Sequence, residues 1–325
     1  MTSGTTAGFG SAERGLFGAY GLEVESRFLE MLNPPLRVRV MGSGEGPPVV
    51  LVHGGGGVGA TWAPLMAGLS GMRLVVVDRP GFGLSGGFDY RGVDLRRHAV
   101  AFLESLLDGL GLERAAFVGN SMGGLWSFWL ALDRPERVSA LAQLGSTALL
   151  TDTMAPLPMR LLSVPGLNRL MLAAERPTPE QAKKFLARLG HDPAVIEDRL
   201  PEEFFEMLAA SEKLPGYATA WLTLVERCLG LRGAVSDVRL GEDELRRVQQ
   251  PTLFVWGDGD VFGGPEIGER AVRVMPDARI EAVAGGHLPW LDEPEICAEV
   301  VSEFLRPRSN AATTKMAFVT GDGSK

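Results

Sequence analysis

The chain has 325 residues, of which 45% are hydrophobic and 22% are charged, as in an ordinary globular protein. This length allows one large core plus a smaller unit, or two modest domains. The formal net charge of −8 argues against nucleic acid or an anionic membrane as a partner. No stretch reaches the ~18 apolar residues of a membrane span, and residues 1–10 lack the apolar core of a signal peptide. Cys228 and Cys297 are expected to be reduced, buried thiols in a cytoplasmic protein.

Strand-like and helix-like segments alternate along most of the chain. Solid apolar runs and period-two alternation indicate strands, whereas apolar residues at helical spacing indicate amphipathic helices. Strands are predicted at residues 36–40, 48–52, 74–77, 115–118, 138–144, 252–256 and 279–283, and helices at residues 93–110, 125–132 and 295–305. This alternation predicts an α/β fold with a mostly parallel sheet that helices flank on both faces.

The alternation stops between residues 149 and 250, where helix-like stretches are separated by prolines. We expect an all-helical cap (lid) domain here, lying over the carboxyl edge of the sheet, where ligands bind. The alternative is a packing domain without a role in the site. The core domain would then comprise residues 21–148 and 251–307. Residues 1–20 are expected to be a flexible extension and residues 308–325 a polar tail.

A serine in a glycine-rich turn is the most informative feature. In Gly119-Asn120-Ser121-Met122-Gly123, an apolar strand precedes the serine and a helix-length run follows it. Such a tight strand-to-helix turn exposes the hydroxyl, and flanking glycines let strand and helix approach each other. The segment 83–87 also fits the pattern, but its neighbours are rich in turn residues and cannot open a helix well. Ser121 is therefore the predicted nucleophile.

A serine nucleophile needs a base, and the chain has only four histidines. His287 lies in a glycine-flanked loop directly after the last predicted strand, from which it could reach across the sheet edge. His98 is expected to be a solvated residue of a helix, His191 a structural residue of a turn, and His53 a brace for the glycine loop that follows it. His287 is the predicted base.

The base needs an acid that orients its ring, and residues 257–260 follow a predicted strand with two aspartates. We favour Asp260 as the acid and expect Asp258 to cap the turn. Ser121, Asp260 and His287 then occur in the chain order of serine hydrolases with a strand-to-helix nucleophile turn. Asp292 and Glu293 are expected to be first-turn acids of a helix.

The glycine run 54–57 has a predicted role beside the nucleophile. The backbone amides of Met122 and Gly55 are the expected oxyanion donors, because glycine lets the backbone approach the substrate. A flexible turn is the alternative, and the sequence pattern of a phosphate-binding loop does not follow. The histidines and cysteines lack metal-ligand spacing, so neither a metal nor a cofactor is predicted.

Taken together, these features resemble the α/β-hydrolase superfamily over about residues 36–305. The landmarks are the segments 53–55, 78–85, 119–124, 256–260 and 286–287, with Trp62 downstream of the first. The resemblance implies a serine hydrolase with a helical cap domain, in the branch of esterases and carbon–carbon hydrolases. It also makes Asp78 and Ser85 residues of a structural turn. Superfamily members that open epoxides or displace halide use aspartate where this chain has Ser121.

The resemblance implies hydrolysis of an ester, or related acyl bond, of a small apolar substrate through an acyl-enzyme. The alternative is a carbon–carbon hydrolase of the meta-cleavage-product type, with haloperoxidase-like activity a remote third and an inactive ligand-binding protein a different class. Gly54, Trp62, Trp126 and Trp290 are the expected pocket residues. Apolar residues of the insertion would either line the pocket or fill the core of the cap; these are Met154, Met159, Leu161, Leu162, Phe204, Phe205, Met207 and Trp221.

Overall fold

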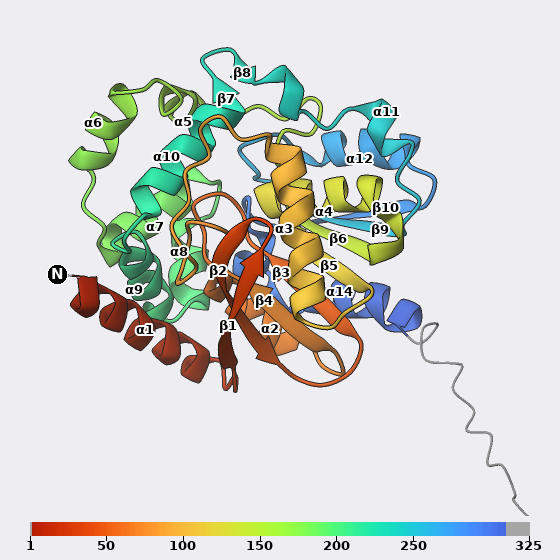
Figure 1. Cartoon of the computed structure of the whole chain (residues 1–325), viewed down its shortest axis with the longest axis horizontal. Coiled ribbons are helices and arrows are strands. Elements are labelled where there is room, and N and C mark those ends of the chain that lie inside the picture. Colours follow the sequence, from red (N-terminus) through yellow and green to blue (C-terminus); the bar gives the residue numbers. More distant parts are fainter. Residues whose placement is uncertain (1, 310–325) are drawn as a thin grey trace, which may run out of the picture.

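In the computed structural model, which describes residues 2–309, eight strands form one sheet in the order β1-β2-β4-β3-β5-β6-β9-β10 (Figure 1). The strands from β4 to β10 run parallel, and β1 and β2 form an antiparallel hairpin at one edge. The strands are β1 (Glu25–Leu32), β2 (Pro35–Ser43), β3 (Pro48–Val52), β4 (Arg73–Val77), β5 (Ala115–Asn120), β6 (Val138–Thr147), β9 (Thr252–Gly257) and β10 (Ala278–Val283). The predicted, mostly parallel sheet is confirmed.

Helices cover both faces of this sheet because successive side chains of a strand point to opposite faces. In β3, Val50 and Val52 belong to the core on the side of α3 and α4, whereas Val49 and Leu51 belong to the core on the side of α2 and α14. No helix within the described part of the chain is long and apolar enough to span a membrane. The flanking helices are α2 (Ala63–Gly68), α3 (Leu95–Gly109), α4 (Ser121–Asp133), α12 (Pro265–Val274), α13 (Pro289–Asp292) and α14 (Pro294–Ser309).

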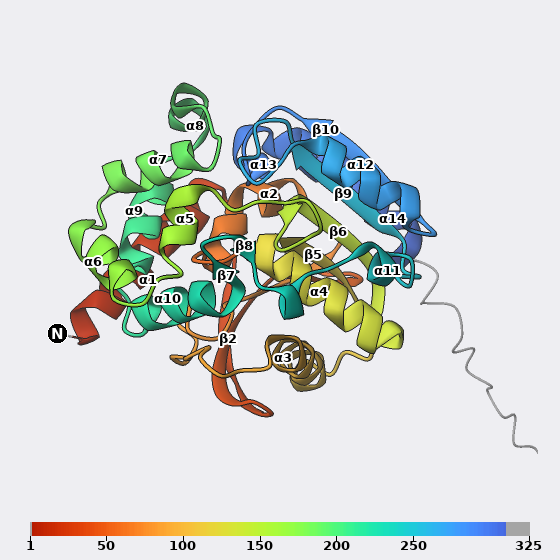
Figure 2. The ribbon, with the colours of Figure 1, turned by 90° about the horizontal axis from the view of Figure 1, so that it is seen from above.

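Between β6 and β9 the chain leaves the sheet and forms a helical insertion, seen at one side of the molecule in Figure 2. A two-stranded hairpin of β7 (Leu229–Gly230) and β8 (Gly233–Ala234) follows its last long helix. The insertion contains α5 (Leu157–Leu161), α6 (Leu167–Ala174), α7 (Pro179–Arg188), α8 (Pro193–Arg199), α9 (Glu202–Ser211), α10 (Tyr217–Cys228) and α11 (Glu242–Leu245). Prolines begin α7 and α8. Proline is favourable there because the amide of the first helical residue makes no hydrogen bond within the helix, so its absence costs nothing.

The N-terminal segment differs from the prediction. Residues 1–20 were expected to be flexible, but Thr2–Ala19 form helix α1, which packs beside α9 of the insertion (Figure 1). Phe9 and Leu16 are completely buried there. The glycine-rich composition of this segment disfavours a helix locally, so tertiary packing stabilises it. Residues 310–325 of the predicted polar tail lie outside the described residues.

Candidate active site

The site lies where neighbouring parallel strands end. The strands β3, β5, β6, β9 and β10 are adjacent in the sheet, so the loops after their carboxyl ends meet at one edge. These loops carry the glycine run, the proposed nucleophile, and the proposed acid and base. A cavity at this edge is lined by Gly54, Gly55, Ser121, Met122, Ser146 and His287, together with residues of the insertion.

Ser121 occupies a sharp turn between β5 and α4. Its φ of 50° is in the left-handed region, which is rare for a residue other than glycine and typical of a strained functional turn. The approach of strand to helix requires the neighbouring glycines. A Cβ on Gly119 would lie 2.7 Å from Cα of Gly124, and one on Gly123 would lie 2.0 Å from the carbonyl oxygen of Val52. The geometry is that of a nucleophile elbow.

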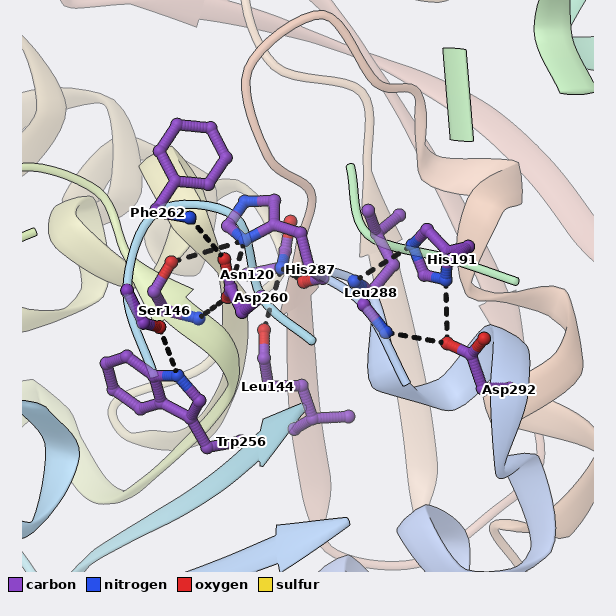
Figure 3. A network of polar contacts seen from close by, with 12 residues as sticks. Asn120, Leu144, Ser146, His191, Trp256, Asp260, Phe262, His287, Leu288 and Asp292 are labelled. Atoms are coloured by element: carbon purple, nitrogen blue, oxygen red, sulfur yellow. Dashed lines mark hydrogen bonds and ion pairs between the residues drawn. The ribbon is translucent and has the colours of Figure 1, made fainter. Parts of the chain in front are cut away.

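His287 and Asp260 are joined at the ends of β10 and β9. Nδ1 of His287 lies 2.9 Å from Oδ2 of Asp260, as Figure 3 shows. Oδ2 also accepts a hydrogen bond from the amide of Ser146 (2.9 Å), and Oδ1 accepts one from the amide of Phe262 (3.0 Å). Burial opposes ionisation of Asp260, but the charge and hydrogen bond of His287, with the two amides, outweigh it and lower the pKa of the carboxyl. Asp260 therefore remains a carboxylate beside the imidazole.

Asp258 has the other role expected of this pair of aspartates. Its Oδ1 accepts a hydrogen bond from the amide of Gly285 (3.1 Å), which fixes the start of the His287 loop. Ser146, which the sequence analysis missed, lies at the end of β6 with Oγ 3.2 Å from Nδ1 of His287. Only the pairing of β6 with β9 brings this serine to the site, and no local sequence pattern marks it.

The nucleophile turn and the His287 loop are joined through Asn120. Its Nδ2 donates hydrogen bonds to the carbonyl oxygens of Leu144 (2.7 Å) and His287 (3.0 Å). Ser121 and His287 both line the cavity, but no hydrogen bond joins their side chains within the described residues. Hydrogen bonds between a nucleophile and its base often tighten only when substrate binds. The structure thus places the two groups in one cavity without the direct bond.

The glycine loop after β3 is held from both sides. Arg79 donates from Nη2 to the carbonyl oxygen of Gly54 (2.7 Å) and from Nε to that of His53 (3.0 Å). From the insertion, the Tyr217 hydroxyl donates to the carbonyl oxygen of Gly56 (3.2 Å). Nε2 of His53 accepts the amide of Arg79 (2.9 Å), and burial, with the Arg79 charge, holds the pKa of His53 well below its usual range. His53 is a neutral brace, as expected.

The insertion also contacts the backbone around His287 through the turn 189–191 (Figure 3). The His287 amide donates to the carbonyl oxygen of Leu189 (2.9 Å), and the Leu288 amide donates to Nε2 of His191 (3.3 Å). Nδ1 of His191 lies 2.6 Å from Oδ2 of Asp292, which also accepts the amide of Gly286 (3.1 Å). Because Nε2 of His191 accepts, its Nδ1 carries the proton.

Asp292 lies in the first turn of the short helix α13, as predicted, and it is also buried against His191. The prediction for His98 was wrong, because its side chain packs among the rings of Phe88, Tyr90 and Trp126. Burial, with the Arg79 charge, lowers the pKa of His98 to about 4.

Three of the four predicted pocket residues do not line the cavity. Trp62 and Trp290 stack on each other with ring centroids 4.2 Å apart in the core beside α2, and Trp126 is buried in the core beside α3. These side chains point into the packed layers between sheet and helices. Gly54 does line the cavity, as predicted. The aromatic lining residues are Phe185, Phe204, Trp221 and Phe262.

The cavity is predominantly apolar and carries little charge. Within the described part of the chain, its lining includes three titratable side chains and neither lysine nor arginine; the three are His287, Glu212 and Cys228. Burial raises the pKa of Cys228 to about 12, so this thiol is neutral and unreactive. The insertion contributes much of the wall through residues of α7, α9 and α10, including Leu186, Leu208 and Leu224.

A parallel sheet flanked by helices, a serine elbow at its carboxyl edge and a histidine–aspartate pair beside it define an α/β-type hydrolase. The chain belongs to the Alpha/beta hydrolase family, whose sequence profile matches residues 49–300. It is a hydrolase of this family, as the sequence resemblance implied.

Similar proteins include hydrolases named for hydroxy-oxo-dienoate and related substrates and a carboxylesterase. A 2-hydroxy-6-oxo-6-phenylhexa-2,4-dienoate hydrolase from Comamonas testosteroni is 29% identical over 82% of this chain and 90% of its own length. A 2-hydroxy-6-oxononadienedioate/2-hydroxy-6-oxononatrienedioate hydrolase from Burkholderia vietnamiensis is 30% identical over 83% of this chain and 91% of its own. A carboxylesterase structure from Bacillus subtilis shares the fold with a TM-score of 0.72 and 23% identity, covering 93% of this chain and 98% of its own.

Proposed function

We propose that the protein is a serine esterase that hydrolyses a small, largely apolar ester through an acyl-enzyme. Ser121 is the nucleophile, His287 the base, and Asp260 the acid that orients the base. The observation that carries the proposal is the 2.9 Å contact between His287 and Asp260 at the cavity that Ser121 also lines. A buried carboxylate on Nδ1 leaves Nε2 of His287 free to take a proton.

In the proposed reaction, Oγ of Ser121 attacks the acyl carbonyl while His287 takes its proton. The amides of Met122 and Gly55 bind the oxyanion; Met122 follows the nucleophile at the start of α4, and both residues line the cavity. His287 then protonates the leaving alcohol, and water attacks the acyl-enzyme by the reverse route. The Asp260 carboxylate stabilises the imidazolium that forms at each step.

The second candidate is carbon–carbon bond hydrolysis of a meta-cleavage product, which the dienoate hydrolases among the similar proteins favour. A dienoate substrate carries a carboxylate, which binds most favourably beside a cationic side chain. The cavity lining in the described residues contains neither lysine nor arginine, and it contains the carboxyl group of Glu212. This charge distribution favours an ester without an anionic group. We therefore place ester hydrolysis first.

The test combines a fluorophosphonate probe with a panel of p-nitrophenyl esters of increasing chain length and a vinylogous 1,5-diketone ring-cleavage product. We expect rapid labelling that maps to the peptide with Ser121 and not to that with Ser85. Ser121→Ala should lower kcat/KM by about 10⁴-fold or more, with an unchanged melting temperature. Near-normal ester turnover by this variant would contradict the proposal. Turnover of the diketone alone would select the second candidate.

Loss of catalysis is the remaining alternative, in which the fold only binds a ligand. Folded wild-type protein that neither reacts with the probe nor hydrolyses any member of the panel would support it. We also propose a cytoplasmic location, since Cys228 and Cys297 are both buried and unpaired, as expected for thiols in a reducing compartment.

A further inference from the structure

One acidic side chain lines the otherwise apolar part of the cavity that the insertion forms. Glu212 follows the last residue of α9, and its neighbours in the lining include Leu208, Ser211 and Phe185. The Glu212 carboxyl has no hydrogen-bond or ion-pair partner among the side chains that the structure describes. A half-buried carboxyl beside apolar side chains is unfavourable when charged and unpaired. It therefore suits a ligand that brings the missing partner.

The surroundings of Glu212 specify the sign of that partner. α9 ends at Ser211, so the partial negative charge of the helix C-terminus lies beside the carboxyl. Burial, and the charge of Glu175, raise the pKa of Glu212 to about 7, while Lys213 lowers it. A second anion here would be repelled by both the helix end and the carboxylate. A cation would be attracted by both.

We propose that Glu212 forms a cation-binding subsite of the cavity and that the preferred substrate is an ester whose distal end carries a protonated amine. This inference rests on the proposed ester hydrolysis and adds the chemical class of the substrate. The ammonium group donates hydrogen bonds to the Glu212 carboxylate while the apolar chain between amine and ester contacts Phe185, Leu208 and the rest of the lining. Glu212 does not take part in bond cleavage.

The preference should depend on pH because Glu212 must be ionised to pair with an ammonium group. The charged groups that act on Glu212 are Glu175 and Lys213. The buried hydroxyl of Tyr217 is also nearby, and its pKa is raised mainly by burial and then by the charge of Glu212. The bond-breaking steps are the same for all the esters, so the ratio between two esters isolates the effect of Glu212. We expect the ratio of amine ester to neutral ester to increase from about pH 6 to about pH 8.

The experiment uses matched p-nitrophenyl acyl esters, from butanoyl to octanoyl, that end in an ammonium, a methyl or a carboxylate group. At about pH 8, the wild-type kcat/KM for the ammonium ester of the best length should exceed that for its methyl isostere by about tenfold or more. The carboxylate ester should fall below the methyl ester by a similar factor. Equal values for all three end groups at every length would overturn the proposal.

Two variants separate the subsite from the rest of the mechanism. In Glu212→Gln, the ratio of ammonium to methyl ester should fall to about one and lose its pH dependence. The matched control is Glu206→Gln, on the exposed side of helix α9, which ends just before Glu212; this variant should keep the wild-type ratio. A wild-type ratio in Glu212→Gln would overturn the cation subsite while Ser121-dependent ester hydrolysis still stood. Ester turnover that survives Ser121→Ala would instead overturn the proposed function.

Discussion

Arg39 and Glu13 form a buried, bidentate ion pair between the sheet and the N-terminal helix. Nη1 and Nη2 of Arg39 donate to the two carboxylate oxygens of Glu13 at 2.7 and 2.6 Å, and Nη1 also lies 3.6 Å from Oδ2 of Asp78. Because α1 also packs against α9, this pair joins three parts of the chain, namely the N-terminus, strand β2 and the insertion.

Replacing Glu13 with Gln should leave Arg39 buried beside an incomplete set of partners. We expect the free energy of unfolding to fall by about 3–5 kcal/mol, measured by urea denaturation. Glu30→Gln is the control, because Glu30 pairs with Arg37 at 3.4 Å on the surface and should contribute about 1 kcal/mol or less. Equal effects of the two substitutions would show that the N-terminal helix is not anchored by the ion pair.

The Asp260 carboxylate should affect catalysis much more than stability. In Asp260→Asn, the amide cannot stabilise the imidazolium, so kcat should fall by about three to four orders of magnitude. Asp258→Asn is the matched control, since Asp258 only accepts the amide of Gly285. It should retain most of the activity. A comparable loss in both variants, measured as steady-state kcat on one ester, would contradict the assignment of Asp260.

The His191–Asp292 pair should influence the reaction through the position of His287. In Asp292→Ala, the acceptor of the Nδ1 proton of His191 is removed, so the ring orientation that lets Nε2 accept the Leu288 amide is lost with it. We expect kcat to fall about tenfold to a hundredfold with little change in KM. His191→Ala should have a similar effect, and the double variant should be no worse than either. Additive losses would show that the two residues act independently.

Glu212 should make stability depend on pH. Its pKa is raised from 4.5 to about 7 in the folded protein, so the folded state binds this proton more tightly than the unfolded chain does. The free energy of unfolding therefore decreases as pH rises through this window. Glu212→Gln should be more stable than wild type above pH 7, by up to about 3 kcal/mol, and the difference should shrink towards pH 5. A constant difference in melting temperature across this range would contradict the raised pKa.

Much of the fold and of the candidate site could be predicted because the signals are local. The alternation of apolar runs with helical segments predicts the sheet, and the glycines around Ser121 predict its turn. The segment 257–260 could be identified because it follows a strand and precedes His287 in the chain, and Asp260 was favoured on the expectation that one of its two aspartates caps the loop and the other faces the imidazole. In each case the residues that determine the structure lie within one short segment of the sequence.

The errors concern residues whose environment depends on distant parts of the chain. Trp62 and Trp290 are 228 positions apart in sequence, and only the docking of α13 beside α2 stacks them in the core. His98 is one of several polar residues in its segment of α3, but the rings of Tyr90 and Trp126 enclose it. Helix α1 has a composition that disfavours a helix and is stabilised by packing against α9.

The turn 189–191 has a consequence for protein engineering. Leu189 and His191 of the insertion hydrogen-bond to the loop that carries His287. The insertion therefore cannot be exchanged without affecting the catalytic residues of the core domain. A chimera in which this insertion replaces that of another family member would contain His191 without the carboxylate that accepts its Nδ1 proton, unless Asp292 is introduced as well. Recombination experiments that aim to change substrate preference would therefore have to exchange the turn 189–191 together with the segment that contains His287 and Asp292.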